Sequence, residues 1–109
     1  MIKSTLFFLA TIVSVGVMSV PASADIGKGQ KWYVKSCKAC HGSGVKGAAM
    51  KTQDQWDELF AKGGEIIIKK HLGTNAEVFF NGDSFKSQAP DLRDFLFEYG
   101  SDSGTIPPC

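Results

Sequence analysis

Apolar positions recur with the period of an α-helix through most of the chain that follows residue 24. In the first such segment Gly29, Tyr33 and Cys37 lie four residues apart, so a helix that starts near Gly27 places them on one face. The glycine on that face would let a second helix approach closely. The rest of the chain has the pattern of short helices joined by loops, without repeats or low-complexity tracts, and we predict an all-α fold.

Two further helices are predicted in the middle of the chain. Thr52 or Asp54 can cap the first of them, which is expected to end at Gly63-Gly64. The second covers residues 66–72 and is expected to stop at Gly73. The apolar face of the first is made of Trp56, Leu59 and Phe60.

The last part of the chain is less regular. Asn81-Gly82 is a turn signal, and both a small hairpin and an irregular loop are compatible with residues 78–85. Pro90 suits the first position of a last helix, which Gly100 would end. The polar tail, residues 101–109, is predicted to be loose.

The beginning of the chain is typical of a secretory signal peptide. Lys3 precedes an almost uncharged apolar run from Leu6 to Val20, and Pro21-Ala22-Ser23-Ala24 supplies a cleavage site. We therefore expect residues 1–24 to be removed, residues 25–109 to form one small domain, and the protein to be periplasmic or otherwise exported. An uncleaved membrane anchor is the alternative, although the apolar run is short for a span.

Cys-Lys-Ala-Cys-His at residues 37–41 is the segment that points to chemistry. The pattern C-x-x-C-H is an attachment site for c-type haem. On a helical turn Cys37 and Cys40 lie on one face, so both thiols can add to the vinyl groups of one porphyrin. His41 follows at once and is the predicted proximal iron ligand. One covalent haem c would also give this small domain a large apolar plate to fold around.

Two other readings of the cysteine pair are weaker. A zinc site needs four ligands, and beyond the motif the chain offers only His71, Cys109 and carboxylates. A thioredoxin-like redox pair follows a buried strand, and the residues before Cys37 do not have a strand pattern.

Charge is distributed unevenly along the chain. Residues 25–51 carry six lysines against one acidic residue, whereas residues 52–109 carry ten acidic and five basic residues. The lysines bracket the haem motif. They can form a basic rim that steers an acidic redox partner, or they can be ordinary solvated side chains.

Several residues match positions of one known family: Gly29 and Tyr33 on the first helix, Cys37, Cys40 and His41 at the haem motif, and Phe95 and Tyr99 on the last helix. On these residues the segment from 27 to 100 resembles a class I monohaem cytochrome c. In that family the first and last helices cross at a contact between a glycine and aromatic residues. The segment from Cys37 to Trp56 is similar to small bacterial cytochromes with a Gly-Ala-Pro-Lys loop after the haem motif, and here that loop reads Gly47-Ala48-Ala49-Met50. The resemblance implies short helices packed around one covalent haem, and one-electron transfer.

The chain departs from that family at the sixth iron ligand. Class I cytochromes supply a methionine from a loop just before the last helix, and residues 73–89 contain none. His71 is one candidate because it shares a helical face with two isoleucines; a solvated histidine at a helix C-terminus is the competing interpretation. An open or weakly ligated iron, with Asn81 among the weak ligands, stays open as a second possibility. Met50 is a third, although the resemblance places its loop on the proximal side.

We predict a periplasmic electron carrier rather than an enzyme, with protein redox partners, whose docking surfaces would be acidic if the lysines form a basic rim. The alternatives are a haem protein that binds a small ligand at an open distal site, and a haem subunit of a larger oxidoreductase. Neither a nucleic-acid partner nor a membrane span after signal removal is expected. Cys109 has no partner once Cys37 and Cys40 hold haem, so an intermolecular disulfide, a free thiol and a residue without a role all stay open.

Overall fold

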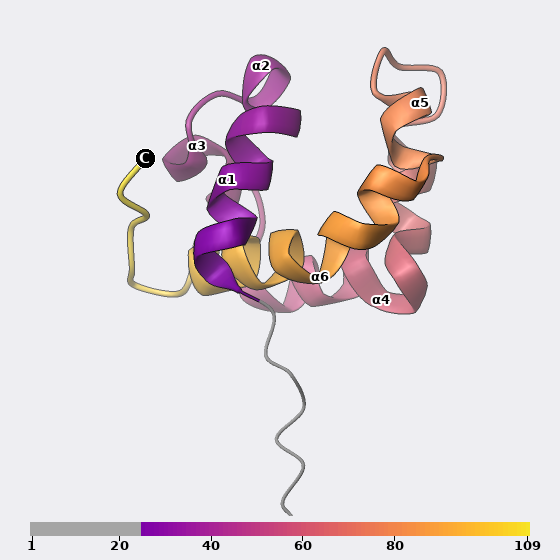
Figure 1. Ribbon diagram of the computed structural model, residues 1–109. Helices are drawn as coiled ribbons and strands as arrows, with labels where there is room; N and C mark the ends of the chain where they lie inside the picture. Colours follow the sequence, from indigo (N-terminus) through magenta and orange to yellow (C-terminus); the bar gives the residue numbers. More distant parts are fainter. Residues whose placement is uncertain (1–24) are drawn as a thin grey trace, which may run out of the picture.

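The computed structural model describes residues 25–109, and this part of the chain is all-α as predicted, with no strand (Figure 1). None of its helices combines the length and the hydrophobicity that crossing a bilayer requires. The predicted signal peptide, residues 1–24, lies outside the described residues. The helices are α1 (Ile26–Ser36), α2 (Lys38–His41), α3 (Gly44–Ala48), α4 (Gln53–Lys70), α5 (Glu77–Phe80) and α6 (Asp83–Glu98).

The crossing of α1 over α6 holds the first and last helices together, as the sequence predicts. Gly29 lies at the crossing, where a Cβ atom would be only 2.7 Å from Cβ of Phe95. One turn later Tyr33 is buried with its ring centre 5.6 Å from that of Phe95. The close approach needs a residue without a side chain, and this is why a glycine stands on the buried face of α1.

Helix α4 begins and breaks where the sequence predicts. Thr52 caps it: its hydroxyl accepts the N–H of Gln55 at 3.2 Å, and the Gln55 side chain accepts the N–H of Thr52 at 3.0 Å. At residues 61–64 the backbone leaves the helical conformation, with Gly63 and Gly64 at φ +70° and +85°. Beyond this kink the helix changes direction and runs on to His71, its C-cap.

The segment between α4 and α6 was only partly predicted. No hairpin forms around Asn81-Gly82, because residues 77–80 make the short helix α5. Pro90 does not begin the last helix: α6 starts at Asp83 and carries Pro90 inside it. Because proline has no N–H to bond the carbonyl of Lys86, the helix can continue only by bending, and Figure 1 shows α6 changing direction along its length.

The tail, residues 101–109, is attached to the rest of the molecule rather than loose. The N–H of Ser101 donates to the carbonyl of Lys51 at 2.9 Å, and the carbonyl of Cys109 accepts the N–H of Val45 at 3.2 Å. These are backbone hydrogen bonds, which any residue type can make. For this reason a polar tail sequence gives no sign of them.

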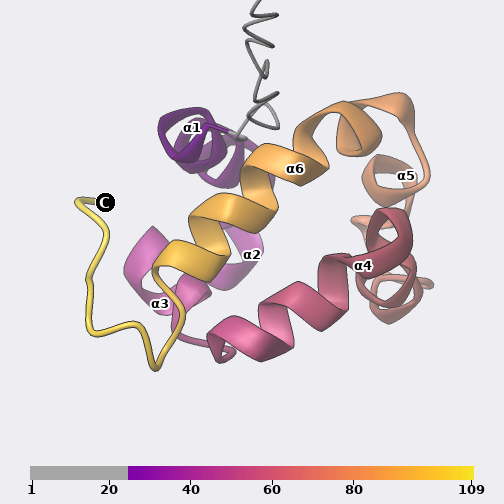
Figure 2. The ribbon, with the colours of Figure 1, turned by 90° about the horizontal axis from the view of Figure 1, so that it is seen from below.

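Helix α6 contacts helices from both the beginning and the middle of the described chain, among them α1 and α4. Figure 2 shows it running diagonally across the molecule, with α1 on one side, α4 and α5 on the other, and α2 and α3 partly behind it. This arrangement leaves the haem motif of α2 facing the end of α4 and the residues that lead into α5.

Candidate functional site

One turn of helix presents the three motif residues. Cys37 ends α1 and precedes α2, and the carbonyl of Cys37 accepts the N–H of His41 at 3.0 Å. Gly42 follows at φ +80°, where a side chain would be strained, and turns the chain away. Neither Cys37 nor Cys40 is in a disulfide. The motif therefore offers two thiols and an imidazole from a single short element.

Buried aromatic side chains fix the position of this element. The hydroxyl of Tyr33 donates to the carbonyl of Gly42 at 2.8 Å, and its ring lies against Gly47. Burial, with smaller contributions from Cys37 and Cys109, raises the pKa of Tyr33 to about 12, so the phenol stays protonated and keeps donating.

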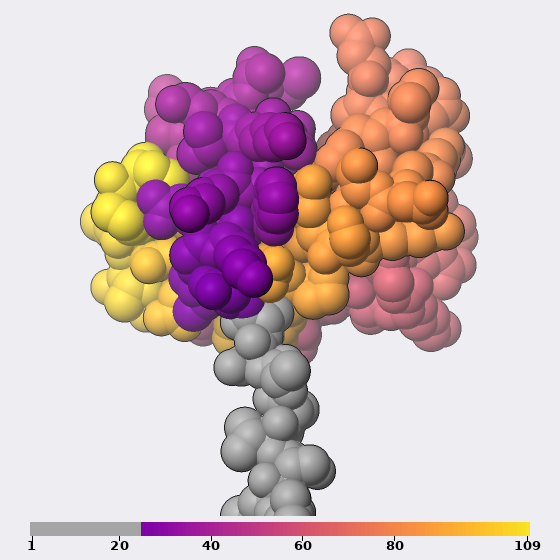
Figure 3. Space-filling model, viewed as in Figure 1, coloured from indigo at the N-terminus to yellow at the C-terminus, as the bar shows by residue number. Residues whose placement is uncertain are grey.

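Two adjoining hollows lie between the haem motif and the segment formed by the end of α4 and α5. The smaller, of about 260 Å³, is lined mainly by apolar side chains, among them Leu59, Ile67 and Leu96. The larger, of about 420 Å³, lies towards residues 74–76. Five residues line both hollows: Cys37, His41, Lys70, His71 and Phe80. Figure 3 shows the molecular surface hollowed between α1 and α2 on one side and the α5 region on the other.

The two histidines of the described residues meet across these hollows. The ring centres of His41 and His71 are 6.1 Å apart, and the ring planes make an angle of 82°. His71 is half-buried and its Nδ1 lies 2.7 Å from the carbonyl oxygen of Ile67. The ring of Phe80 stacks on His71 with the centres 4.0 Å apart and the planes 18° from parallel.

A cytochrome c family model matches residues 26–95. The chain belongs to the cytochrome c family. It therefore carries covalently bound c-type haem and takes part in electron transport, in a family whose members are generally electron carriers rather than enzymes. No curated protein and no solved structure matches the chain closely enough to be counted as a relative.

The side chains of this cytochrome fit a covalent haem. The two thiols are three residues apart on one helical turn; Cys37 borders both hollows and Cys40 the larger one, and these mainly apolar hollows can bury the faces of a flat macrocycle. Burial and the neighbouring Cys40 raise the pKa of Cys37 to about 11 in the chain without haem. Because the thiolate is the form that attacks a disulfide or an oxidant, this thiol resists oxidation while it is free.

The structure places the other candidate ligands less favourably. Met50 borders the smaller hollow, but its side chain is 45% exposed. Asn81 is exposed and borders neither hollow. Cys109, whose role the sequence leaves open, borders neither hollow and lies beside Gly44, with its sulfur 2.6 Å from where a Cβ on that glycine would be.

Sequence reasoning missed Phe80 and the carbonyl of Ile67, the two groups that hold the ring of His71. The carbonyl belongs to the backbone and carries no signal in the sequence. Phe80 lies in a segment for which the sequence predicts a hairpin or an irregular loop, whereas the structure has the short helix α5 there.

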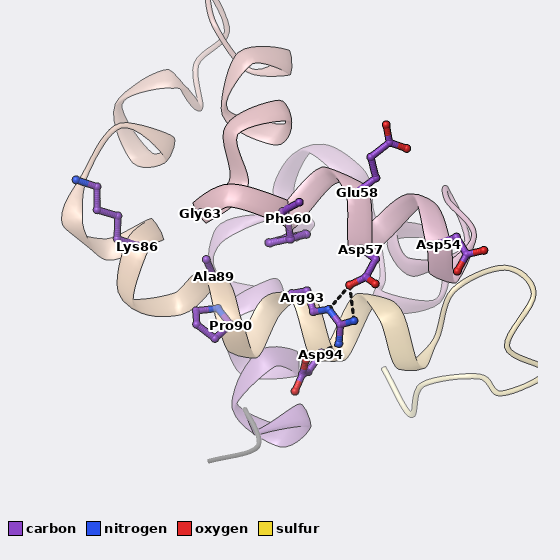
Figure 4. A pocket seen from close by; sticks show the side chains of 11 residues that line it. Asp54, Asp57, Glu58, Phe60, Gly63, Lys86, Ala89, Pro90, Arg93 and Asp94 are labelled. Carbon is purple, nitrogen blue, oxygen red and sulfur yellow. Dashed lines mark hydrogen bonds and ion pairs between the residues drawn. The ribbon is translucent and has the colours of Figure 1, made fainter. Parts of the chain in front are cut away.

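Positive and negative side chains border different cavities of the molecule. The side chains of Lys51 and Lys70 border the haem hollows, and no carboxylate of residues 25–109 does. A separate open pocket between α4 and α6 shares no residue with them and carries most of its charge as carboxylates (Figure 4). There Arg93 bridges Asp57 and Asp94. The remaining acidic residues of that pocket are Asp54 and Glu58.

Proposed function

We propose that this cytochrome is a periplasmic carrier of single electrons, with its haem attached to Cys37 and Cys40 and its iron bound by His41. The observation that carries the proposal is the placement of all three residues on one turn that borders two apolar hollows. The cleavable signal predicted for residues 1–24 supports export. The haem supplies the chemistry, a one-electron change between ferric and ferrous iron.

The chain's own residues would hold and shield that group. Two thioether bonds to Cys37 and Cys40 would fix the edge of the macrocycle, and His41 would fix its distance from α2. Apolar side chains such as Leu59 and Leu96 would exclude water, which matters because burial and polarity set the potential of the iron. The exposed Cys40 marks the side from which a partner protein would approach.

Attachment can be tested by the mass of the denatured mature protein from a host that attaches c-type haem. We expect the mass of a chain beginning at Asp25 plus one haem. Replacing Cys37 and Cys40 by serine should abolish attachment, whereas Cys109→Ser, the matched control, should keep it. The mass of the bare polypeptide for the wild-type protein would refute the proposed function, and a mass that includes residues 1–24 would refute export through a cleaved signal.

We further propose that lysines beside the haem guide acidic partners. Lys70 borders both haem hollows, while Lys86 lines the acidic pocket on other faces of α4 and α6. Exposed charges act over about 10 Å at 0.1 M ionic strength. Only a lysine on the surface beside the haem should therefore change the rate at which a redox partner associates there.

Oxidation of the reduced protein by ferricyanide, an anion, tests this role. Lys70→Gln should slow the reaction severalfold at low salt and weaken its salt dependence, whereas Lys86→Gln should not. A cationic cobalt complex as oxidant should show the opposite effect for Lys70→Gln. Equal rates for both variants with both oxidants would leave the lysines as ordinary surface residues.

A further inference from the structure

We propose that His71 binds the iron opposite His41, so that the haem is held between two histidines whose ring planes are nearly perpendicular. This inference rests on the proposed attachment at Cys37, Cys40 and His41. It replaces the methionine typical of the family's first class by a second imidazole, supplied from the C-terminus of α4.

The distance between the rings fits two imidazoles on one metal ion. A metal–imidazole bond is about 2.0 Å long and the ring centre lies roughly 1 Å behind the nitrogen, so two such rings have centres about 6 Å apart. The ring centres of His41 and His71 are 6.1 Å apart. The separation of α2 and α4 in the structure therefore suits two imidazole ligands on one ion.

The ring of His71 is held in the orientation and tautomer that ligation needs. A carbonyl oxygen can only accept, so Nδ1 of His71 donates its proton to the carbonyl of Ile67 at 2.7 Å. In the neutral ring Nε2 is then the nitrogen with the free lone pair. A backbone carbonyl that orients a histidine in this way is the usual outer partner of a metal-binding imidazole.

Packing fixes the remaining freedom of the ring. Phe80 stacks on one face of His71, and Phe80 is itself buried against Phe79 and Phe85. The backbone is held as well, since the hydroxyl and N–H of Thr74 both donate to the carbonyl of His71, at 2.6 and 3.2 Å. A histidine that merely faced water at a helix end would need none of these contacts.

Met50 is the competing ligand that the sequence allows. Its side chain is 45% exposed, while the structure gives His71 two fixing partners. A methionine raises the potential of a haem, and a second histidine lowers it relative to a methionine. The choice between these residues therefore determines which partners can reduce the protein.

Spectroscopy of the haem-loaded wild-type protein tests the inference directly. We expect low-spin ferric iron without the near-infrared band of methionine ligation. Because perpendicular imidazole planes leave two iron d orbitals close in energy, we also expect a strongly anisotropic low-spin EPR signal. The ferrous protein should bind carbon monoxide slowly or weakly.

Three variants separate the candidate ligands. His71→Ala should raise the spin state and admit carbon monoxide, and added imidazole should restore the low-spin spectrum. His71→Met should raise the reduction potential. Met50→Leu, the matched control, should leave the spectrum and potential of the wild type unchanged.

High-spin wild-type iron, or a methionine-type band that Met50→Leu removes, would overturn the inference while leaving the proposed function intact, provided that the mass still shows attached haem. Absence of attached haem would overturn both. If His71→Ala fails to mature, the wild-type EPR signal and near-infrared spectrum still decide the matter.

Discussion

Adding one methyl group at Gly29 tests whether the crossing of α1 and α6 is as close as the structure has it. In Gly29→Ala the new Cβ would be 2.7 Å from Cβ of Phe95 and 2.8 Å from the backbone carbonyl carbon of Asp91. Contacts that short do not occur in folded proteins. Because one of the two atoms belongs to the backbone of α6, no side-chain rotation can relieve the overlap, and the helices must separate.

The expected loss follows from two opposing terms. Overpacking of a close contact costs about 1–3 kcal/mol. Alanine in place of glycine inside a helix recovers up to about 1 kcal/mol. We therefore expect Gly29→Ala to lower the free energy of unfolding by about 1–2 kcal/mol, which corresponds to a fall in melting temperature of roughly 4–16 °C for a domain of this size.

Gly27→Ala is the matched control on the same helix. Its new Cβ would be 3.2 Å from one oxygen of Asp25, a side chain that can move, and the position is exposed. Urea unfolding of the haem-loaded protein should show a change within about 0.5 kcal/mol for this variant. If both variants unfold at the same urea concentration as the wild type, the helices do not cross at Gly29 as described.

Two further predictions concern single hydrogen-bonding groups. Tyr33→Phe removes the donor to the carbonyl of Gly42 and should lower the free energy of unfolding by about 1–2 kcal/mol in urea unfolding. Because the folded pKa of Tyr33 is raised to about 12 from 10, its contribution is complete below pH 10 and is lost as the pH rises towards 12; Tyr33→Phe should flatten the fall in stability over that window. Thr52→Ala removes the capping box with Gln55 and should cost about 1 kcal/mol in the same assay, whereas Thr52→Ser should cost little.

The parts of the fold that the sequence predicted are those with strong local signals. Spacing alone placed Gly29 and Tyr33 on the buried face of α1, and Thr52 with Gln55 is a recognisable cap. The break at Gly63-Gly64 could be predicted because a pair of glycines is a strong local signal for the end of a helix. In the structure both residues adopt positive φ values, which glycine accepts readily.

The sequence predicts a later start for α6 because the first helical position is the one that proline occupies most often in helices. A signal for the longer helix was present: Phe85, Ala89, Leu92 and Leu96 keep one apolar stripe across Pro90, and all four are buried. Tertiary burial of that stripe outweighs the hydrogen bond that Pro90 cannot make.

The residues of the site also differ in how far the sequence alone could predict them. Cys37, Cys40 and His41 are consecutive enough for a motif to identify them. The placement of His71 opposite His41 depends on where the kinked α4 ends, and no local pattern specifies that. The resemblance to cytochromes could not supply it either, because those proteins use a methionine from another part of the chain.

The kink of α4 at Gly64 is linked to His71, the proposed iron ligand, by a series of aromatic contacts. Gly64 lies at φ +85° with the ring of Phe85 against its backbone, where a Cβ would be 2.8 Å from the ring. The ring of Phe85 is 4.8 Å from that of Phe80, which in turn stacks on His71 at 4.0 Å. A side chain at Gly64 should therefore push on two aromatic rings in succession and loosen His71.

Gly64→Ala and Gly63→Ala form a pair that isolates this effect. Both variants force alanine into a left-handed conformation, which costs about 1–2 kcal/mol. Only the first also meets a side chain, since nothing lies within 4 Å of a Cβ at Gly63. We expect both to lower the unfolding free energy, and Gly64→Ala alone to raise the high-spin fraction of the oxidised protein and the rate at which the ferrous protein binds carbon monoxide. If the two variants have the same spin state and the same rate at a temperature where both are folded, the aromatic rings do not transmit strain from the kink to His71, and the ligand is held by its bond to Ile67 instead.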